Sequence, residues 1–197
     1  LEFYRKISEI RAQAFEDYRK NIINETRLSI EELLGINEGS SLEYKGSMWT
    51  KYKTSGDKYR IDPNAPRNSK KDKNYDLQDG ILKTIAAFLN SGGGTLLIGV
   101  QDKDRGTPDG ILAEVCGIEN DFFFLQDNKQ DTEGYNHALI QILNDAFDDS
   151  SIVPLYIKIS FPKHQEKIIC RIDVEKVPRI KDGQIYAKTK TLGECEF

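Results

Sequence analysis

Two glutamates and a lysine stand close together in the stretch NEGSSLEYKGS, residues 37 to 47. Glu43 follows Glu38 by five positions, and Lys45 follows Glu43 by two. Because alternate residues of a strand share a face, Glu43 and Lys45 lie on one face and Tyr44 lies on the other. Glu-x-Lys on one strand is typical of metal-dependent nucleases, although glutamate and lysine also alternate on many solvent-facing strands.

A third carboxylate, Asp102, comes just beyond the apolar run TLLIGV at 95–100, which predicts a strand covered on both faces. If that strand pairs with SLEYKGS, Asp102 converges with Glu38 and Glu43. Three carboxylates at one point repel each other unless a divalent cation lies among them, and Mg²⁺ or Mn²⁺ takes hard oxygen ligands. We therefore expect Glu38, Glu43 and Asp102 to be metal ligands and catalytic residues. Lys45 would offset the charge that develops on a phosphate.

The glycines at 92–94 suggest a nucleotide loop, but their place in the chain argues against it. A phosphate-binding loop runs from strand to loop to helix, so that helix N–H groups meet the phosphate. Here the order is helix, glycines, strand, and no Gly-Lys-Ser or Gly-Lys-Thr follows. A tight turn with close backbone packing is the favoured interpretation, and an ATP-binding domain remains an alternative.

Residues 47–74, the basic segment, form an insertion rich in Lys, Asn, Gly, Pro and Ser, which predicts an extended loop rather than a buried element. From position 45 to position 73, nine bases face only three acids, and Trp49, Tyr52, Tyr59 and Tyr75 are interleaved with them. Cations mixed with aromatic rings suit phosphates and stacked bases, whereas a solvated loop with incidental lysines is the alternative. The predicted nucleic-acid-binding residues are Lys45, Lys51, Lys53, Lys58, Arg60, Arg67, Lys70, Lys71 and Lys73.

The remaining elements alternate between helix and strand. Amphipathic spacing predicts a helix over residues 1–24, and Ser29 with Glu32 predicts a capped short helix that stops at Gly35. Asp76 is expected to cap a helix that ends at Asn90, and a further helix is expected at EGYNHALIQILNDAF. Strands are expected at LYIKISF and KIICRIDV, joined by PKHQE as a hairpin, and at GQIYAKT. The sequence therefore predicts an α+β fold, a mixed β-sheet with flanking helices, preceded by an N-terminal helical segment.

Composition limits the function classes. The chain of 197 residues carries a net charge of −4, which argues against an indiscriminate nucleic-acid binder. No apolar run approaches the ~18 residues of a membrane span, so we expect no membrane partner. Three cysteines without a CxxC spacing favour reduced thiols and a cytoplasmic location. The first residue is Leu1, so a piece of a longer protein is expected.

The order Glu38-x4-Glu43-Tyr44-Lys45, then AAFLNSGGGTLLIGVQD, then GIEND and a later helix and hairpin resembles the Schlafen AlbA-type domain. Tyr44 replaces the usual Phe of this family, and Leu89 replaces its second Ala. The resemblance implies a helical segment at 1–35, followed by a nucleic-acid-binding domain at 36–197 that contains the insertion 47–74. Older labels of this family describe the domain as ATPase-like. In members that cleave RNA, the three acidic site residues fall on Glu38, Glu43 and Asp102.

This chain also differs from the Schlafen family pattern in two respects. The Schlafen nuclease core pairs two lobes, whereas this chain has one, so a homo-oligomer or an adjoining domain of the same protein is an expected partner. The basic segment is longer than the family norm. We predict a DNA- or RNA-binding module of a larger bacterial or viral protein of the transcriptional-regulator or defence type. The alternatives are a nuclease with Mg²⁺ or Mn²⁺, acting on structured RNA, and an ATP-binding domain; without nuclease activity no cofactor is expected.

Overall fold

The computed structural model describes residues 6, 28–55, 58–61, 73–102, 113–126, 128–147, 152–178, 185–189 and 193–195. The chain divides into two compact units, Leu1–Leu33 and Leu34–Phe197, and each is considered by itself. Apart from Lys6, the helix predicted over residues 1–24 lies outside the described residues. The predicted division at residue 35 stays a prediction.

The short helix α2 (Ile30–Leu34) begins with the predicted capping box. The Glu32 amide donates to Ser29 Oγ at 3.2 Å, and the Ser29 amide donates to Glu32 Oε2 at 2.7 Å. Two N–H groups that have no partner inside the helix are thereby satisfied by side chains. The prediction of Ser29 and Glu32 as a pair is confirmed.

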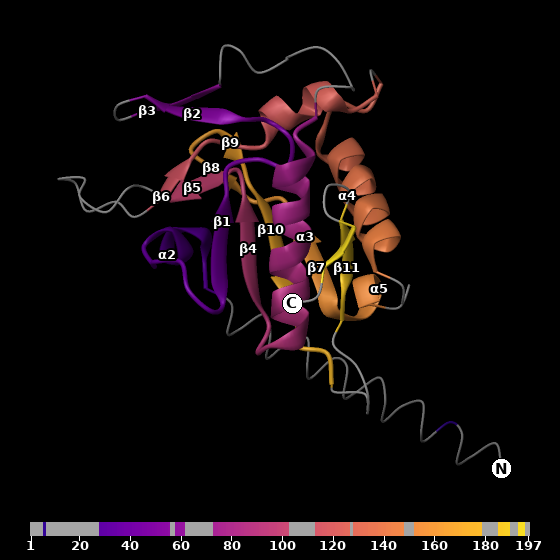
Figure 1. The fold of residues 1–197 in the computed structure, drawn as a ribbon. Coiled ribbons are helices and arrows are strands. Elements are labelled where there is room, and N and C mark those ends of the chain that lie inside the picture. The colour runs from indigo at the N-terminus through magenta and orange to yellow at the C-terminus, as the bar shows by residue number, and fades with distance from the viewer. Residues whose placement is uncertain are drawn as a thin grey trace. The chain divides into compact units, whose positions relative to one another are not determined.

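A four-stranded mixed sheet forms the centre of the second unit, in the order β1 (Leu42–Lys45), β4 (Gly94–Ile98), β10 (Cys170–Val174), β7 (Ile157–Ser160). β1 runs parallel to β4, whereas β10 is antiparallel to both β4 and β7. Figure 1 shows helix α3 (Tyr75–Asn90) lying in front of this sheet and helix α4 (Thr132–Ala146) beside it. The predicted α+β class with a mixed sheet and flanking helices is confirmed.

The central strand β4 is buried on both faces, as its apolar run predicts. Leu96, Leu97 and Ile98 are all 0% exposed. Leu96 and Ile98 belong to the main hydrophobic cluster with side chains of α3 and α4, whereas Leu97 points to the opposite face. The main core therefore lies between one face of the sheet and the two helices.

The N-cap of helix α3 comes earlier in the chain than predicted. Asn74, rather than Asp76, is the N-cap, because the Asn74 side chain accepts a hydrogen bond from the Asp76 amide. Asp76 lies in the first turn, where a carboxylate still favours the positive end of the helix dipole. The helix ends at Asn90 as predicted, and the Asn90 amide group is hydrogen bonded to both the N–H and the C=O of Ile185.

The turn from α3 into β4 requires glycine at Gly93. Its φ is +84°, and an added Cβ would lie 2.6 Å from the Val174 carbonyl oxygen. Both facts favour a residue without a side chain. Close packing between this turn and β10 therefore accounts for a glycine here.

The remaining elements are short. They are β2 (Tyr52–Ser55), β3 (Lys58–Ile61), β5 (Val100–Asp102), β6 (Ala113–Val115), the 3₁₀ helix η1 (Glu119–Phe124), α5 (Ile152–Tyr156), β8 (Lys163–His164), β9 (Lys167–Ile168), β11 (Ala187–Thr189) and β12 (Gly193–Cys195). The predicted hairpin of LYIKISF and KIICRIDV is confirmed, because β7 and β10 pair antiparallel. β8 and β9 pair with each other at the turn of this hairpin, with positive φ at Gln165 and Glu166. Leu155 and Tyr156, expected in a strand, lie in α5, so that expectation was wrong at its first two residues.

The basic segment also differs from its prediction as an extended loop. β2 and β3 pair antiparallel as a hairpin, and Ser47–Thr50 is buried throughout. Met48 and Trp49 are 0% and 1% exposed, because their side chains belong to the main hydrophobic cluster. The start of this segment is therefore part of the core.

Candidate nucleic-acid interface

The outer edge of β1 is covered by the residues that precede it. In a parallel pair, every second N–H and C=O of the edge strand points away from its neighbour. The Tyr44 amide donates to Glu38 Oε1 at 2.6 Å, and the Leu42 carbonyl oxygen accepts from the Gly39 amide at 2.9 Å. Glu38 is thus held against β1 through one carboxylate oxygen.

Glu43 and Lys45 form an ion pair on one face of β1. Their side chains are 29% and 27% exposed, so both are half-buried and reachable from solvent. Register with β4 places Glu43 beside Leu96 and Lys45 beside Ile98, on the face that α3 covers further along the sheet. An acid and a base at the edge of that face can contact a ligand that approaches β1.

Tyr44 lies on the other face. It is 4% exposed, and its hydroxyl donates to the Ile36 carbonyl oxygen at 2.7 Å. Burial, followed by the negative charges of Glu38 and Asp102, raises the pKa of Tyr44 to about 12. Tyr44 therefore anchors β1 in the core, on the sheet face opposite the main cluster.

Asp102, the third predicted carboxylate, lies near enough to Glu38 to affect its pKa. Burial raises the pKa of Glu38, and the negative charges of Glu43 and Asp102 raise it further. The hydrogen bond from the Tyr44 amide and the charge of Lys45 act in the opposite direction. Within the described ranges, however, no three Asp, Glu, His or Cys side chains are arranged to hold one metal ion. The three oxygen donors suit Mg²⁺ chemically, but a shared coordination site is not assembled here.

Asp102 owes its position to close packing at the end of β1. The Gly99 amide donates to the Lys45 carbonyl oxygen at 2.8 Å, which continues the pairing of β1 beyond β4. A Cβ added at Gly46 would lie 2.5 Å from the side chain of Gln101, so the two residues are closely packed and a larger residue at position 46 would displace that side chain. β5, which carries Gln101 and Asp102, therefore lies directly against the exit of β1.

A buried carboxylate, Asp121, holds the turn that follows β1, and sequence reasoning missed it. Ser47 Oγ donates to it at 2.6 Å and Thr50 Oγ1 at 2.7 Å, while the amides of Met48, Trp49 and Thr50 donate at 2.8, 3.2 and 2.9 Å. Burial raises the pKa of Asp121, and these hydrogen bonds act against that shift. The available signal was the place of Asp121 directly before three consecutive phenylalanines, since a carboxylate that is buried among apolar side chains needs several donors.

Trp49, one of the aromatic residues expected to stack with bases, is not available for stacking. It is 1% exposed, its indole N–H donates to Gln78 Oε1 at 3.0 Å, and its ring packs against Phe124 and Tyr135. Lys73 Nζ lies 3.7 Å from the centroid of the same ring. The expectation of a stacking role for Trp49 was therefore wrong, because the ring fills the core instead.

The predicted cations fall into three groups. Lys45, Lys51 and Lys73 are described with their side chains, and Lys51 is exposed. Lys53, Lys58 and Arg60 lie on the β2–β3 hairpin, whose backbone alone is described. Arg67, Lys70 and Lys71 lie outside the described residues. Their predicted contacts with nucleic acid stay predictions.

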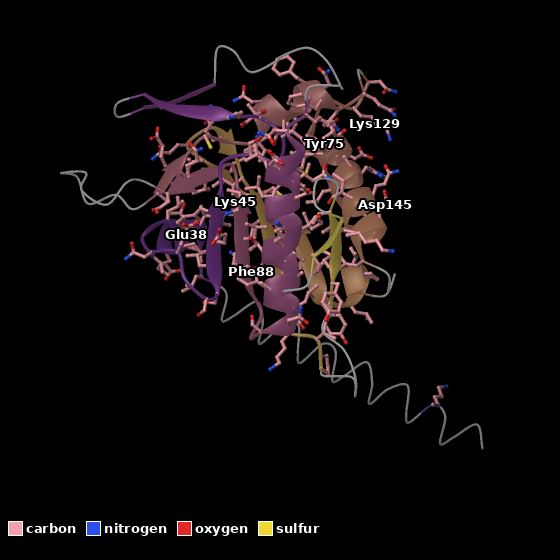
Figure 2. The ribbon with its side chains drawn as sticks, in the orientation of Figure 1. Glu38, Lys45, Tyr75, Phe88, Lys129 and Asp145 are labelled. Atoms are coloured by element: carbon pink, nitrogen blue, oxygen red, sulfur yellow. The ribbon has the colours of Figure 1, made fainter. Side chains whose placement is uncertain are left out.

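A groove of about 710 Å³ lies along α4, and Lys73, Lys129, His137 and Asp145 are among its lining residues. Figure 2 shows Lys129 and Asp145 on the side of α4, away from Glu38 and Lys45 on the side of β1. The groove mixes charges of both signs. It is thus distinct from the edge of β1.

Comparisons with known proteins give a family and two structures of limited similarity. The family described as Schlafen, AlbA_2 matches residues 38–194. No curated protein sequence matches the chain. The solution structure of the N-terminal domain of a protein described as related to the ATP-dependent DNA helicase RecG, from Nitrosomonas europaea, has 15% identity and a TM-score of 0.48, over 85% of this chain and 82% of that one. The DIP2311 protein from Corynebacterium diphtheriae has 16% identity and a TM-score of 0.44, over 89% of this chain and 26% of that one.

Proposed function

Because the chain belongs to the Schlafen AlbA_2 family, we propose that it binds nucleic acid through the edge of β1 and the basic segment, as a module of a larger regulatory or defence protein. One observation carries the proposal. Lys45, half-exposed on the edge strand, is separated by Gly46 alone from the turn that begins the basic segment. A cation on a strand and a cation-rich hairpin thus adjoin each other along the chain.

The charge of this region fits a polyanion. Nine bases and three acids between positions 45 and 73 leave an excess of six positive charges, whereas the whole chain carries −4. Lys and Arg that neutralise phosphates release counterions, which drives binding and makes it sensitive to salt. Because the rest of the chain is net acidic, it would repel a polyanion and so keep the ligand on this basic surface.

A binding assay with three ligands tests the proposal. Labelled transfer RNA, single-stranded DNA and double-stranded DNA are each incubated with the chain, once with Mn²⁺ and once with chelator, and scored for shift and for cleavage. We expect a shift with at least one ligand in both conditions. Absence of any shift at low salt would remove the proposal.

A metal-dependent nuclease is the second candidate, and the mutual influence of three carboxylates favours it. Burial first, and then the charges of Glu43 and Asp102, raise the pKa of Glu38, and a divalent cation would relieve the part of that shift that comes from repulsion between carboxylates. Mg²⁺ or Mn²⁺ would supply an activated water for attack on a phosphodiester. The double variant Glu43→Ala, Asp102→Ala should then lose Mn²⁺-dependent cleavage and keep most of its binding. Cleavage that survives in the double variant would rule the nuclease out.

ATP binding has weaker support, because the glycine turn at Gly93 has a packing reason of its own. Calorimetry with ATP and Mg²⁺ separates this alternative from the other two. A heat of binding would be its minimum requirement. The predicted cytoplasmic location stays a prediction; in the described parts of the chain, no helix combines the length and the apolar character that crossing a bilayer requires.

A further inference from the structure

The two ends of the basic segment meet at one place, which we call the root: the turn Ser47–Thr50 together with Asn74. The Asn74 amide donates to the Trp49 carbonyl oxygen at 3.2 Å. Lys73 Nζ lies over the ring of the same tryptophan, 3.7 Å from its centroid. The chain thus leaves the core at residue 50 and returns to it beside the point of departure. The contacts that hold the root therefore determine the position at which the β2–β3 hairpin starts.

The carboxylate of Asp121 holds one side of the root. It accepts five hydrogen bonds from four consecutive residues, and it is 0% exposed. The side-chain oxygen of Ser47 also accepts from the Trp49 amide at 3.0 Å, so the amides of the turn are fixed on both sides. Hydrogen bonds to an ionised acceptor are among the strongest in proteins.

Asp121 is itself held in place by the chain around it. Its own amide donates to the Ile118 carbonyl oxygen at 2.9 Å, within the turn that begins η1. The Ile118 amide donates to the Ile168 carbonyl oxygen at 2.9 Å, and the Ile168 amide donates to Glu119 Oε1 at 2.7 Å. These bonds tie η1 to β9, so the acceptor for the root is a fixed part of the domain rather than a loose side chain.

The root lies between two cations that the proposed function uses. Lys45 comes two residues before Ser47, and Lys51 comes directly after Thr50. Since every amide from Met48 to Thr50 is bonded to Asp121, the spacing of the two lysine backbones does not depend on free rotation of the intervening chain. Two cations at a fixed spacing bind a phosphate backbone better than two on a mobile chain, because less conformational freedom is lost on binding.

We propose that Asp121 is a positioning residue for nucleic-acid binding: through the root it fixes Lys45 and Lys51 at the spacing at which both engage one phosphate backbone. The inference rests on the proposed function. It adds to that function a buried residue, Asp121, that would not contact the nucleic acid itself. The substitution of choice is Thr50→Val, which keeps the β-branched shape and removes one donor to Asp121. Ser47→Ala, which removes another donor, is the second variant.

The matched control is Thr84→Val on α3. Thr84 Oγ1 donates to the Gly80 carbonyl oxygen at 3.1 Å, a hydrogen bond within the helix and outside the root. Binding of a labelled single-stranded oligonucleotide to the full chain is measured by fluorescence anisotropy between about 50 and 200 mM salt. We expect Thr50→Val and Ser47→Ala to weaken binding about tenfold and to lower the salt slope by about one. Thr84→Val should bind as the wild type does.

A double-mutant cycle separates positioning from a loss of stability. Lys45→Ala and Lys51→Ala are made singly and together, in the wild type and in Thr50→Val. We expect their effects on binding to be non-additive in the wild type and closer to additive in Thr50→Val, which keeps four of the five hydrogen bonds to Asp121. If the wild type binds but the root variants keep its affinity, slope and coupling, Asp121 is not a positioning residue. If the wild type does not bind at all, the proposed function itself is wrong.

Discussion

Thr50 and Asp121 are 71 positions apart in the chain, yet the backbone and the hydroxyl of Thr50 both donate to the same carboxylate oxygen, at 2.9 and 2.7 Å. This contact connects the exit of β1 with the 3₁₀ helix η1. Because of this contact, the start of the basic segment forms a fixed turn of the core although its sequence is polar. The candidate site and the basic segment are joined through it.

Removing the carboxylate should cost much stability. Asp121→Ala removes the acceptor of five hydrogen bonds, and only the amides of Trp49 and Thr50 keep another acceptor, Ser47 Oγ. Each buried group left unsatisfied costs about 1–3 kcal/mol. We expect the free energy of unfolding to fall by about 3 kcal/mol or more, measured by urea denaturation. Asp145→Ala, at an exposed position on α4, is the control and should change it little. A loss below about 1 kcal/mol for Asp121→Ala would contradict the account of this turn.

The single tryptophan of the chain reports on the buried state of Trp49 directly. At 1% exposure, its fluorescence should be blue-shifted and protected from iodide in the native protein, and lose that protection in urea. Added oligonucleotide should leave the protection unchanged, because the ring is not free to stack with a base. Quenching by iodide as strong in the native as in the unfolded protein would show that the ring is exposed.

The glycine turn offers a matched pair of substitutions. An added Cβ at Gly93 meets the Val174 carbonyl oxygen at 2.6 Å and stands at a φ of +84°, whereas one at Gly92 meets nothing within 4 Å. Gly93→Ala should destabilise the protein by about 2 kcal/mol or more, from backbone strain and from the contact. Gly92→Ala should change stability by less than about 0.5 kcal/mol. Thermal unfolding compares the two, and equal effects would show that the turn is not packed as described.

Stability should depend on pH through Glu38. Burial and the nearby charges of Glu43 and Asp102 raise its pKa in the folded state above its ordinary value of 4.5. Its contribution to stability is therefore complete below that value and is lost as pH rises through the raised pKa. Glu38→Gln removes this titration, so the variant should gain stability relative to the wild type as pH rises.

Urea denaturation of both proteins at several pH values measures this difference. Glu133→Gln, at an exposed position on α4, is the matched control and should follow the wild type at every pH. A stability difference between Glu38→Gln and the wild type that stays constant with pH, or changes in the opposite direction, would show that the folded state does not favour protonated Glu38.

Much of the fold follows from local patterns in the sequence. TLLIGV predicted a strand buried on both faces, and Leu96, Leu97 and Ile98 are fully buried. The pairing of β1 with β4, assumed when Glu43 and Asp102 were placed near each other, is also present, and the two strands are parallel. The capping pair of α2 and the end of α3 at Asn90 were predicted correctly, because those signals act within a few residues, whereas the N-cap of α3 is Asn74 and not the predicted Asp76.

What the sequence did not reveal depends on contacts between distant residues. Asp121 cannot be paired with Ser47–Thr50 by spacing, since 71 to 74 positions separate them. Burial of Met48 and Trp49 within a polar segment has the same origin. The β2–β3 hairpin did have a local signal, because Gly56 and Asp57 separate two short alternating runs. The abundance of Lys and Ser in this stretch concealed it.

The salt dependence of binding by the wild type and by Lys45→Ala tests the central claim most directly. Anisotropy titrations between about 50 and 200 mM salt give the slope of log K against log salt for each protein. The account predicts a steep loss of affinity in the wild type, and in Lys45→Ala weaker binding with a slope smaller by about one. No measurable binding at low salt, or an affinity that salt and Lys45→Ala both leave unchanged, would contradict it.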